Sequence, residues 1–261
     1  MKNLDAYKLK WIAVIGMILN HIVIAWWDII PTWLRIPLYA TGGLTFPIMG
    51  YFVVEGFKHT SNLKRYISRL LLFGFIAMPF HILAISVPVG GGSPLAYTWL
   101  NIMFSIVLSL FTLFMYDKLK SRILFWFIFV FLIVPVSFMF FEWSFVGILL
   151  VLLFYSVQHE NARRIVPPVV AGILWIVMSF LASGMPGMED MTGLMTNPDF
   201  IPVMASISIG CFVSAFLLKN YNGERGKRMK WLFYILYPLH LAVLAGIALA
   251  LGLLDLSVFG F

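Results

Sequence analysis

One apolar stretch near the start of the chain carries polar side chains that could do chemistry. Lys10, Asn20 and His21 lie in a segment that otherwise has the composition of a membrane-spanning helix. Lys10 and His21 are eleven positions apart, and at ~100° per residue they share one helix face, with His21 ~16 Å deeper. Polar groups are costly in hydrocarbon, so a histidine at this depth is a functional candidate. A neutral imidazole can remove a proton from an amine or a hydroxyl, and we expect His21 to be a general base.

Two further polar side chains lie inside other apolar segments. His240 is nine residues into the last of these segments, which corresponds to a depth of ~14 Å and is close to that of His21. Asn101 lies within the fourth segment. Two histidines at one depth favour a common site over two unrelated packing residues, and we expect His240 to support His21 or to relay its proton.

These side chains need a scaffold, and the composition indicates a membrane protein. Hydrophobic residues make up 62% of the 261 residues, and charged residues only 11%. This excess of apolar residues predicts an all-α polytopic membrane protein that forms a single domain over residues 1–261. Nine segments are long enough, or nearly so, to span a bilayer. They are residues 9–27, 36–57, 67–86, 95–116, 122–140, 143–158, 165–183, 199–218 and 231–254.

The connections between these segments alternate in charge. One set contains 17 of the 18 Lys and Arg residues, and the other contains only Arg35. The positive-inside rule therefore predicts a cytoplasmic N-terminus, and we expect a multi-pass protein of the cell's inner (plasma) membrane. The second set holds most of the acidic residues, namely Asp28, Glu142, Glu189, Asp190, Asp199 and Asp255.

Polar residues also gather where the second and third segments meet the cytoplasm. Glu55 and His59 are four positions apart and share a face if the helix extends that far. Arg69 lies three residues into the next segment, after the exposed pair Lys64 and Arg65. The basic side chains suit a phosphate-bearing ligand that approaches from the cytoplasm. Alternatively, Arg69 extends to the lipid headgroups and Glu55 only balances a neighbouring cation.

Several other site types are excluded by the motifs that the sequence lacks. There is no glycine-rich phosphate loop, no Cys/His metal-ligand spacing and no Gly-x-Ser-x-Gly nucleophile motif. We therefore expect no metal. We also expect no nucleic-acid partner, because the basic residues follow the membrane topology rather than forming one patch.

The chain resembles the TraX family of integral-membrane acetyltransferases, whose namesake acetylates the N-terminus of F pilin. The family usually has Asp before the first histidine, where this chain has Asn20. Lys10 and His21 are also similar to the basic-residue and histidine signature of the broader acyltransferase-3 superfamily. The matching stretches are Lys10 to Asn20-His21-Ile22, Gly43 to Pro47, Glu55 to Thr60, Tyr66 to Leu70, Leu100 to Ile102 and Tyr234 to Leu241.

The resemblance implies an enzyme that transfers an acetyl group from acetyl-CoA to an acceptor amine, such as the N-terminus of a peptide. It implies that His21 is the base, oriented by Asn20 and supported by His240 and Glu55. The donor would enter from the cytoplasm. It would be bound by basic and amide side chains, which are Lys10, His59, Lys64, Arg65, Arg69 and Asn101.

Three alternatives remain at this point. An O-acyltransferase would use the same donor on an envelope glycan or a lipid-linked sugar. A proton-coupled transporter would use intramembrane His and Glu as a relay, although the sequence shows no internal repeat of the kind that many transporters have. A non-enzymatic assembly factor would bind its partner without turnover.

Overall fold

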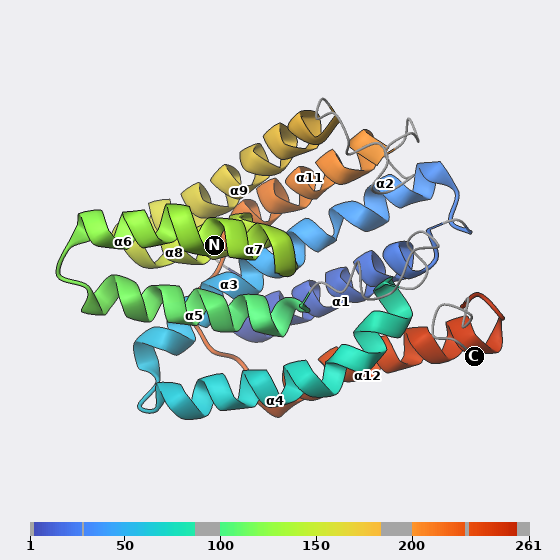
Figure 1. Cartoon of the computed structure of the whole chain (residues 1–261), viewed down its shortest axis with the longest axis horizontal. Coiled ribbons are helices and arrows are strands. Elements are labelled where there is room, and N and C mark those ends of the chain that lie inside the picture. Colours follow the sequence, from blue (N-terminus) through green and yellow to red (C-terminus); the bar gives the residue numbers. More distant parts are fainter. Residues whose placement is uncertain (1–2, 28, 87–99, 184–199, 228–229, 255–261) are drawn as a thin grey trace.

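The computed structural model describes residues 3–27, 29–86, 100–183, 200–227 and 230–254. Within these ranges the protein is all-α, as predicted, and the helices lie side by side along the long axis of the molecule (Figure 1). The helices are α1 (Ala6–Ala25), α2 (Thr32–Ala40), α3 (Gly42–His59), α4 (Leu63–His81), α5 (Ile102–Lys118), α6 (Arg122–Ile128), α7 (Val134–Phe140), α8 (Ser144–Ser156), α9 (Glu160–Ser183), α11 (Phe200–Lys219) and α12 (Lys230–Ala250), with π-helical turns η1 (Ile82–Ser86) and η3 (Phe129–Ile133).

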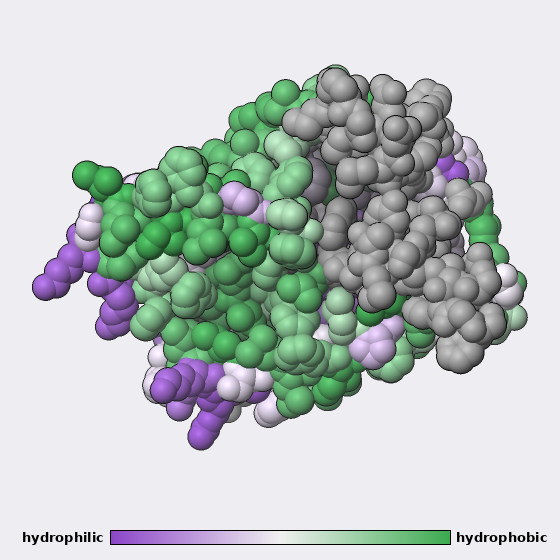
Figure 2. All heavy atoms as spheres, in the orientation of Figure 1, coloured by the Kyte–Doolittle hydropathy of each residue, from purple (hydrophilic) through white to green (hydrophobic). Residues whose placement is uncertain are grey.

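The number of membrane-spanning helices differs from the prediction of nine. In the described ranges, seven helical stretches are long and apolar enough to cross a membrane. The expected spans 95–116 and 143–158 correspond to α5 and α8, which have only 17 and 13 residues, whereas a span needs about 20. The protein is nevertheless a multi-pass membrane protein, and hydrophobic residues cover much of the described part of the face that Figure 2 shows.

The basic connections gather at one end of the bundle, which we call the basic end: residues 3–8, 57–65, 117–122, 155–164 and 219–227. Leu4 pairs with Tyr221, and Arg164 Nη1 donates to the Tyr221 carbonyl at 2.7 Å. The first turn of α4 and the last turns of α3, α5 and α8 line one shared pocket. Figure 2 shows hydrophilic side chains concentrated at this end. This clustering is what the charge alternation predicts for a single membrane face.

The acidic residues expected on the opposite side are described only in part. Asp28, Glu189, Asp190, Asp199 and Asp255 lie outside the described residues. Glu142 is described, and it does not lie in an exposed loop. It occupies the short turn between α7 and α8, inside the bundle.

The helix starts and the helix register follow from local sequence. Asp5 caps α1, Asn62 caps α4 and Asn101 caps α5, each by accepting a hydrogen bond from a backbone N–H of the first turn. Thr41 Oγ1 donates to the Gly16 carbonyl at 2.8 Å, and Thr45 Oγ1 donates to the Ala13 carbonyl at 3.0 Å. These two bonds fix α3 antiparallel to α1, so residues late in α3 lie toward the basic end.

Glycines allow α3 and α11 to approach closely. A Cβ on Gly43 would overlap the carbonyl oxygen of Ile207, and a Cβ on Gly210 would overlap that of Ala40. Small residues at such crossings let membrane helices pack backbone against backbone. This contact holds α11 against α2 and α3 and fixes the wall of the bundle that faces α1.

Candidate active site

Three of the five histidines do converge, and they do so around one carboxylate. His21 of α1, His81 of α4, His240 of α12 and Glu142 form what we call the histidine–glutamate cluster. His21 Nδ1 lies 2.6 Å from His240 Nε2. His21 Nε2 is 3.6 Å from Glu142 Oε1, and His81 Nε2 is 3.8 Å from Glu142 Oε2. Four separate elements thus bring four titratable groups together at the end of the bundle away from the basic end.

The hydrogen bonds assign the protons in the histidine pair. His240 Nδ1 lies 2.9 Å from the Leu236 carbonyl oxygen, which can only accept, so this nitrogen carries the proton. The Nε2 of neutral His240 is therefore an acceptor, and His21 Nδ1–H donates to it. The two rings are nearly coplanar, at 4° with centroids 5.0 Å apart, as an edge-to-edge hydrogen bond requires. In neutral His21, Nε2 then keeps a lone pair beside Glu142, which is the state that a base needs.

A constrained turn presents Glu142 to the histidines. Leu100 N donates to the Phe140 carbonyl at 2.6 Å, and Glu142 N donates to the Leu100 carbonyl at 3.1 Å. Trp143 follows in the left-handed region, with φ 65°, which is strained for a bulky residue. Its ring stacks on Phe46, with centroids 4.9 Å apart, and this packing holds the turn in place.

Several buried polar atoms in and beside the cluster have no hydrogen-bond partner in the described residues. The side chains of His21 and His81 are each 4% exposed, and that of Glu142 is 21% exposed. His81 Nδ1, Glu142 Oε2 and the Tyr237 hydroxyl are buried without a hydrogen-bond partner in the described residues. Buried polar atoms are normally paired, so these three atoms are available to hydrogen-bond a polar group that enters the cluster. No group of three or more ligands positioned to hold a metal ion is found within the described ranges.

Asn20 is not placed as predicted. Its Nδ2 donates to the Tyr39 carbonyl at 3.0 Å, and the side chain packs against Gly42. The amide therefore ties α1 to α2 and α3 rather than orienting the imidazole of His21. Glu142 provides the carboxylate beside His21 instead.

Asn101 also has a structural role in this arrangement. Its Oδ1 accepts from Met103 N at 3.1 Å, and its Nδ2 donates to the Gly74 carbonyl at 2.9 Å. The residue is fully buried, and both halves of the amide are engaged within the bundle. It fixes the start of α5 against α4, next to the Glu142 turn.

Glu55 lies far from His21, at the basic end. Its Oε1 accepts from Arg163 Nη2 at 2.6 Å, and His59 Nδ1 contacts the Glu55 backbone carbonyl at 2.8 Å. The α1–α3 register sets Thr41 level with Gly16, so the rise per residue separates Glu55 from His21 by about 28 Å. The structure does not support the predicted relay between them, because Glu55 instead balances the charge of a buried arginine.

Lys10 and Arg69 are cations without a carboxylate partner in the described residues. Lys10 Nζ lies 4.8 Å from the Phe52 ring centroid and 5.7 Å from that of Phe233 in α12. Arg69 stacks at 6.0 Å on Tyr66, and its Nε is buried without a hydrogen-bond partner in that part of the chain. Lys10 and His21 both contact α12, as their shared helix face predicts.

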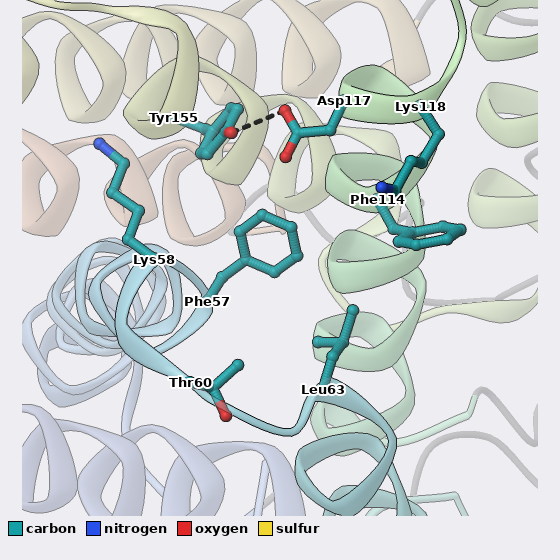
Figure 3. A pocket seen from close by; sticks show the side chains of 8 residues that line it. All are labelled: Phe57, Lys58, Thr60, Leu63, Phe114, Asp117, Lys118 and Tyr155. Carbon is teal, nitrogen blue, oxygen red and sulfur yellow. Dashed lines mark hydrogen bonds between the residues drawn. The ribbon is translucent and has the colours of Figure 1, made fainter.

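A pocket of about 410 Å³ lies at the basic end (Figure 3). Tyr155 donates to Asp117 Oδ1 at 2.6 Å on one side of it. None of the histidine–glutamate cluster lines this pocket, and Lys64 and Arg65 are exposed near its rim. The pocket is lined by Phe57, Lys58, Thr60, Leu63, Phe114, Asp117, Lys118 and Tyr155.

Sequence reasoning missed two members of the cluster as site residues. The charge alternation assigns Glu142 to a connection of the second set, and the sequence pattern does not single out His81. A signal for Glu142 exists in the sequence: its neighbours Phe140, Phe141 and Trp143 are aromatic, and no polar loop surrounds it. An acid in so apolar a connection is more consistent with a buried turn.

Comparisons with known proteins point to one family. The family profile described as "TraX protein" matches residues 6–248. A relative described as "Probable fimbrial assembly protein FimC, serogroup H1", from Dichelobacter nodosus, is 27% identical over 253 residues, covering 93% of this chain and 96% of the relative. No solved structure matches the chain.

Proposed function

The chain belongs to the TraX family, and from this premise we propose that it is an acetyltransferase that moves the acetyl group of acetyl-CoA to an acceptor amine. A pilin-type N-terminus is the acceptor class that the family and the fimbrial relative favour. The observation that carries the proposal is that His21 Nε2 lies 3.6 Å from a carboxylate oxygen of Glu142, while His21 Nδ1 is hydrogen-bonded to His240. Among the described residues of the basic end, no histidine has such a contact with a carboxylate.

Starting from a neutral amine, the reaction needs one base at the acceptor nitrogen. His21 Nε2 takes a proton as the amine attacks the thioester carbon and a C–N bond forms. The C–S bond then breaks, and the departing thiolate receives the proton from His21. Glu142 stabilises the intervening imidazolium electrostatically, and His240 keeps the proton on Nδ1 so that Nε2 faces the acceptor.

The donor is expected to bind near the first turns of α12. Lys10 contacts Phe233, and Phe73, one turn after Arg69, packs against Tyr234 with ring centroids 5.3 Å apart. Both cations therefore lie on helices that pack against this part of α12, whose Phe233 is seven residues or ~10 Å from His240. At this distance they bind the anionic part of the donor rather than polarise its reacting carbonyl, and Lys64 and Arg65 attract it electrostatically at the basic end.

A direct test uses the purified protein in detergent with labelled acetyl-CoA. Two acceptors are offered, a peptide with a pilin-like N-terminus and a cell-wall sugar, and mass spectrometry locates the acetyl group. We expect acetylation of the peptide α-amine. Acetylated sugar alone would establish the O-acyltransferase, and proton-driven transport in proteoliposomes without acyl-CoA would establish a transporter. No donor binding by calorimetry at millimolar acetyl-CoA would overturn the proposal.

Removing either unpaired cation should weaken donor binding. A hydrogen bond to a charged group contributes about 1.5–3 kcal/mol, so Lys10→Met and Arg69→Gln should each raise KM for acetyl-CoA by about 10- to 100-fold. The value of kcat should change little, because neither group reaches the reacting atoms. Steady-state kinetics at varied donor concentration measure both quantities, and Lys120→Met, at an exposed position in the α5–α6 connection, is the matched control. An unchanged KM in both variants would place the donor elsewhere.

A further inference from the structure

We propose that the acceptor binds as an ammonium ion with Glu142 as its counter-ion, and that His21 and His81 take up its two protons separately. This inference rests on the acetyltransferase function proposed above and assigns roles to two residues that the sequence did not single out. It follows from the charge balance of the histidine–glutamate cluster, from its hydrogen-bond donors and acceptors, and from the exposure of its side chains.

The charge of Glu142 has no permanent cation beside it. Within the described ranges its ion-pair partners are only His21 and His81, which are charged only when protonated. Arg35 is engaged elsewhere, since its Nε donates to the Ile30 carbonyl at 2.7 Å and it stacks at 4.9 Å on Trp27. A carboxylate buried without a cation is unfavourable, and a bound ammonium ion would compensate it.

The remaining polar atoms of the cluster mostly accept hydrogen bonds. His21 Nε2 and both Glu142 oxygens can only accept in the neutral-histidine, ionised-carboxylate state. The gaps of 3.6 and 3.8 Å between carboxylate and imidazoles are longer than a direct hydrogen bond. An ammonium group offers three N–H donors, and a hydroxyl group offers one. The set therefore matches an ammonium ion better than an alcohol.

The proton count of the reaction explains why two bases are needed. An ammonium acceptor must lose one proton to become a nucleophile and a second when the C–N bond has formed. The first proton passes through Glu142 to His81, and it leaves the cluster before the next turnover. The second goes to His21 Nε2 and then to the thiolate as the C–S bond breaks. The products are the acetylated amine, the free thiol of the donor and one released proton.

The exposed fractions of the side chains indicate which of them an incoming acceptor meets first. Glu142 is 21% exposed, whereas His21 and His81 are each 4% exposed. An incoming ammonium group therefore meets the carboxylate before it reaches either imidazole. Within the described ranges, the other titratable groups that face Glu142 and these two imidazoles are His240 and Tyr237 of α12 and Tyr39 of α2. His240 is already bonded to His21, which leaves His81 as the separate acceptor of the first proton.

The experiment compares two acceptor peptides that differ only at the first residue, one with an α-amine and one with an α-hydroxyl. We expect Glu142→Gln to raise KM for the amine peptide by about 10- to 100-fold and to leave KM for the hydroxyl peptide within about twofold. Glu224→Gln, at an exposed position of the basic end, is the matched control. If Glu142→Gln fails to fold, Glu142→Asp, which keeps the charge, should retain the preference for the amine.

The role of His81 is tested by the pH profile. His81→Gln should slow the amine peptide most at low pH, and the defect should shrink as pH rises, because more of the amine then arrives without the first proton. The hydroxyl peptide should show a defect that is constant with pH. A purely structural role for His81 would give parallel profiles for both peptides.

Two outcomes separate this inference from the proposed function. If Glu142→Gln raises KM equally for both peptides, the counter-ion role is overturned, while the proposed acetyltransferase function stands. If the wild-type protein acetylates neither peptide, the proposed function fails. The counter-ion role is then decided by calorimetry, which measures how tightly each peptide binds in the absence of acetyl-CoA. Tighter binding of the amine peptide than of the hydroxyl peptide, lost in Glu142→Gln, would support it, and equal binding would refute it.

Discussion

Replacing His21 with alanine lowers the rate of acetyl transfer by about 10²- to 10⁴-fold, the range that a positioned general base contributes. His21 Nε2 carries the lone pair that takes the proton of the acceptor, and the alanine side chain offers no base in its place. Single-turnover acetylation of the peptide α-amine, with saturating acetyl-CoA, measures this loss directly.

Two further variants separate chemistry from folding. His21→Gln can keep the hydrogen bond to His240 but cannot act as a base, so it should fold like the wild type and be equally inactive. His159→Asn changes an exposed histidine beside the start of α9 and should leave the rate unchanged. If His21→Gln is folded and acetylates at the wild-type rate, His21 is not the base.

Substituting either glycine at the α3–α11 crossing should cause the largest loss of stability. An added Cβ on Gly43 or Gly210 overlaps a backbone carbonyl oxygen of the neighbouring helix, and backbone cannot move aside as a side chain can. Overpacking of this kind costs about 1–3 kcal/mol or more, so Gly43→Ala and Gly210→Ala should unfold at clearly lower temperature. Thermal unfolding in detergent, followed by circular dichroism, measures the change.

The matched control lies in α12. Gly246 has nothing within 4 Å of an added Cβ, so Gly246→Ala should be neutral or should stabilise the helix by up to about 1 kcal/mol. If Gly43→Ala and Gly246→Ala unfold at the same temperature, the backbone contact between α3 and α11 is not as close as the structure has it.

The sequence predicted the fold class and the depth of the main residues, because both depend on properties local to one segment. Long apolar runs predict membrane helices, and the confinement of basic residues to alternate connections predicts that they share one end, as they do. Counting residues along one helix placed His21 and His240 at a common depth, and they are hydrogen-bonded. The same counting placed Glu55 at the cytoplasmic end. The difference in depth between Glu55 and His21 already implied that the two residues are far apart.

The number of spanning helices could not be predicted as reliably. The apolar segments around α5 and α8 continue into neighbouring apolar residues, and composition alone does not show where a helix stops. In the structure both helices start at the Leu100–Phe141 pairing, inside the bundle. Their short lengths follow from that contact between distant segments.

The sequence by itself determined a helical membrane protein with a basic end and a deep histidine on the face of α1 that also carries Lys10. Only the tertiary structure decided which groups surround that histidine: Glu142 and His81 beside it, Asn20 turned to the Tyr39 carbonyl, and Glu55 paired with Arg163. The physical reason is that periodicity fixes the direction of a side chain on its own helix. Its partners depend on how close neighbouring backbones can approach and on the conformation of one buried turn.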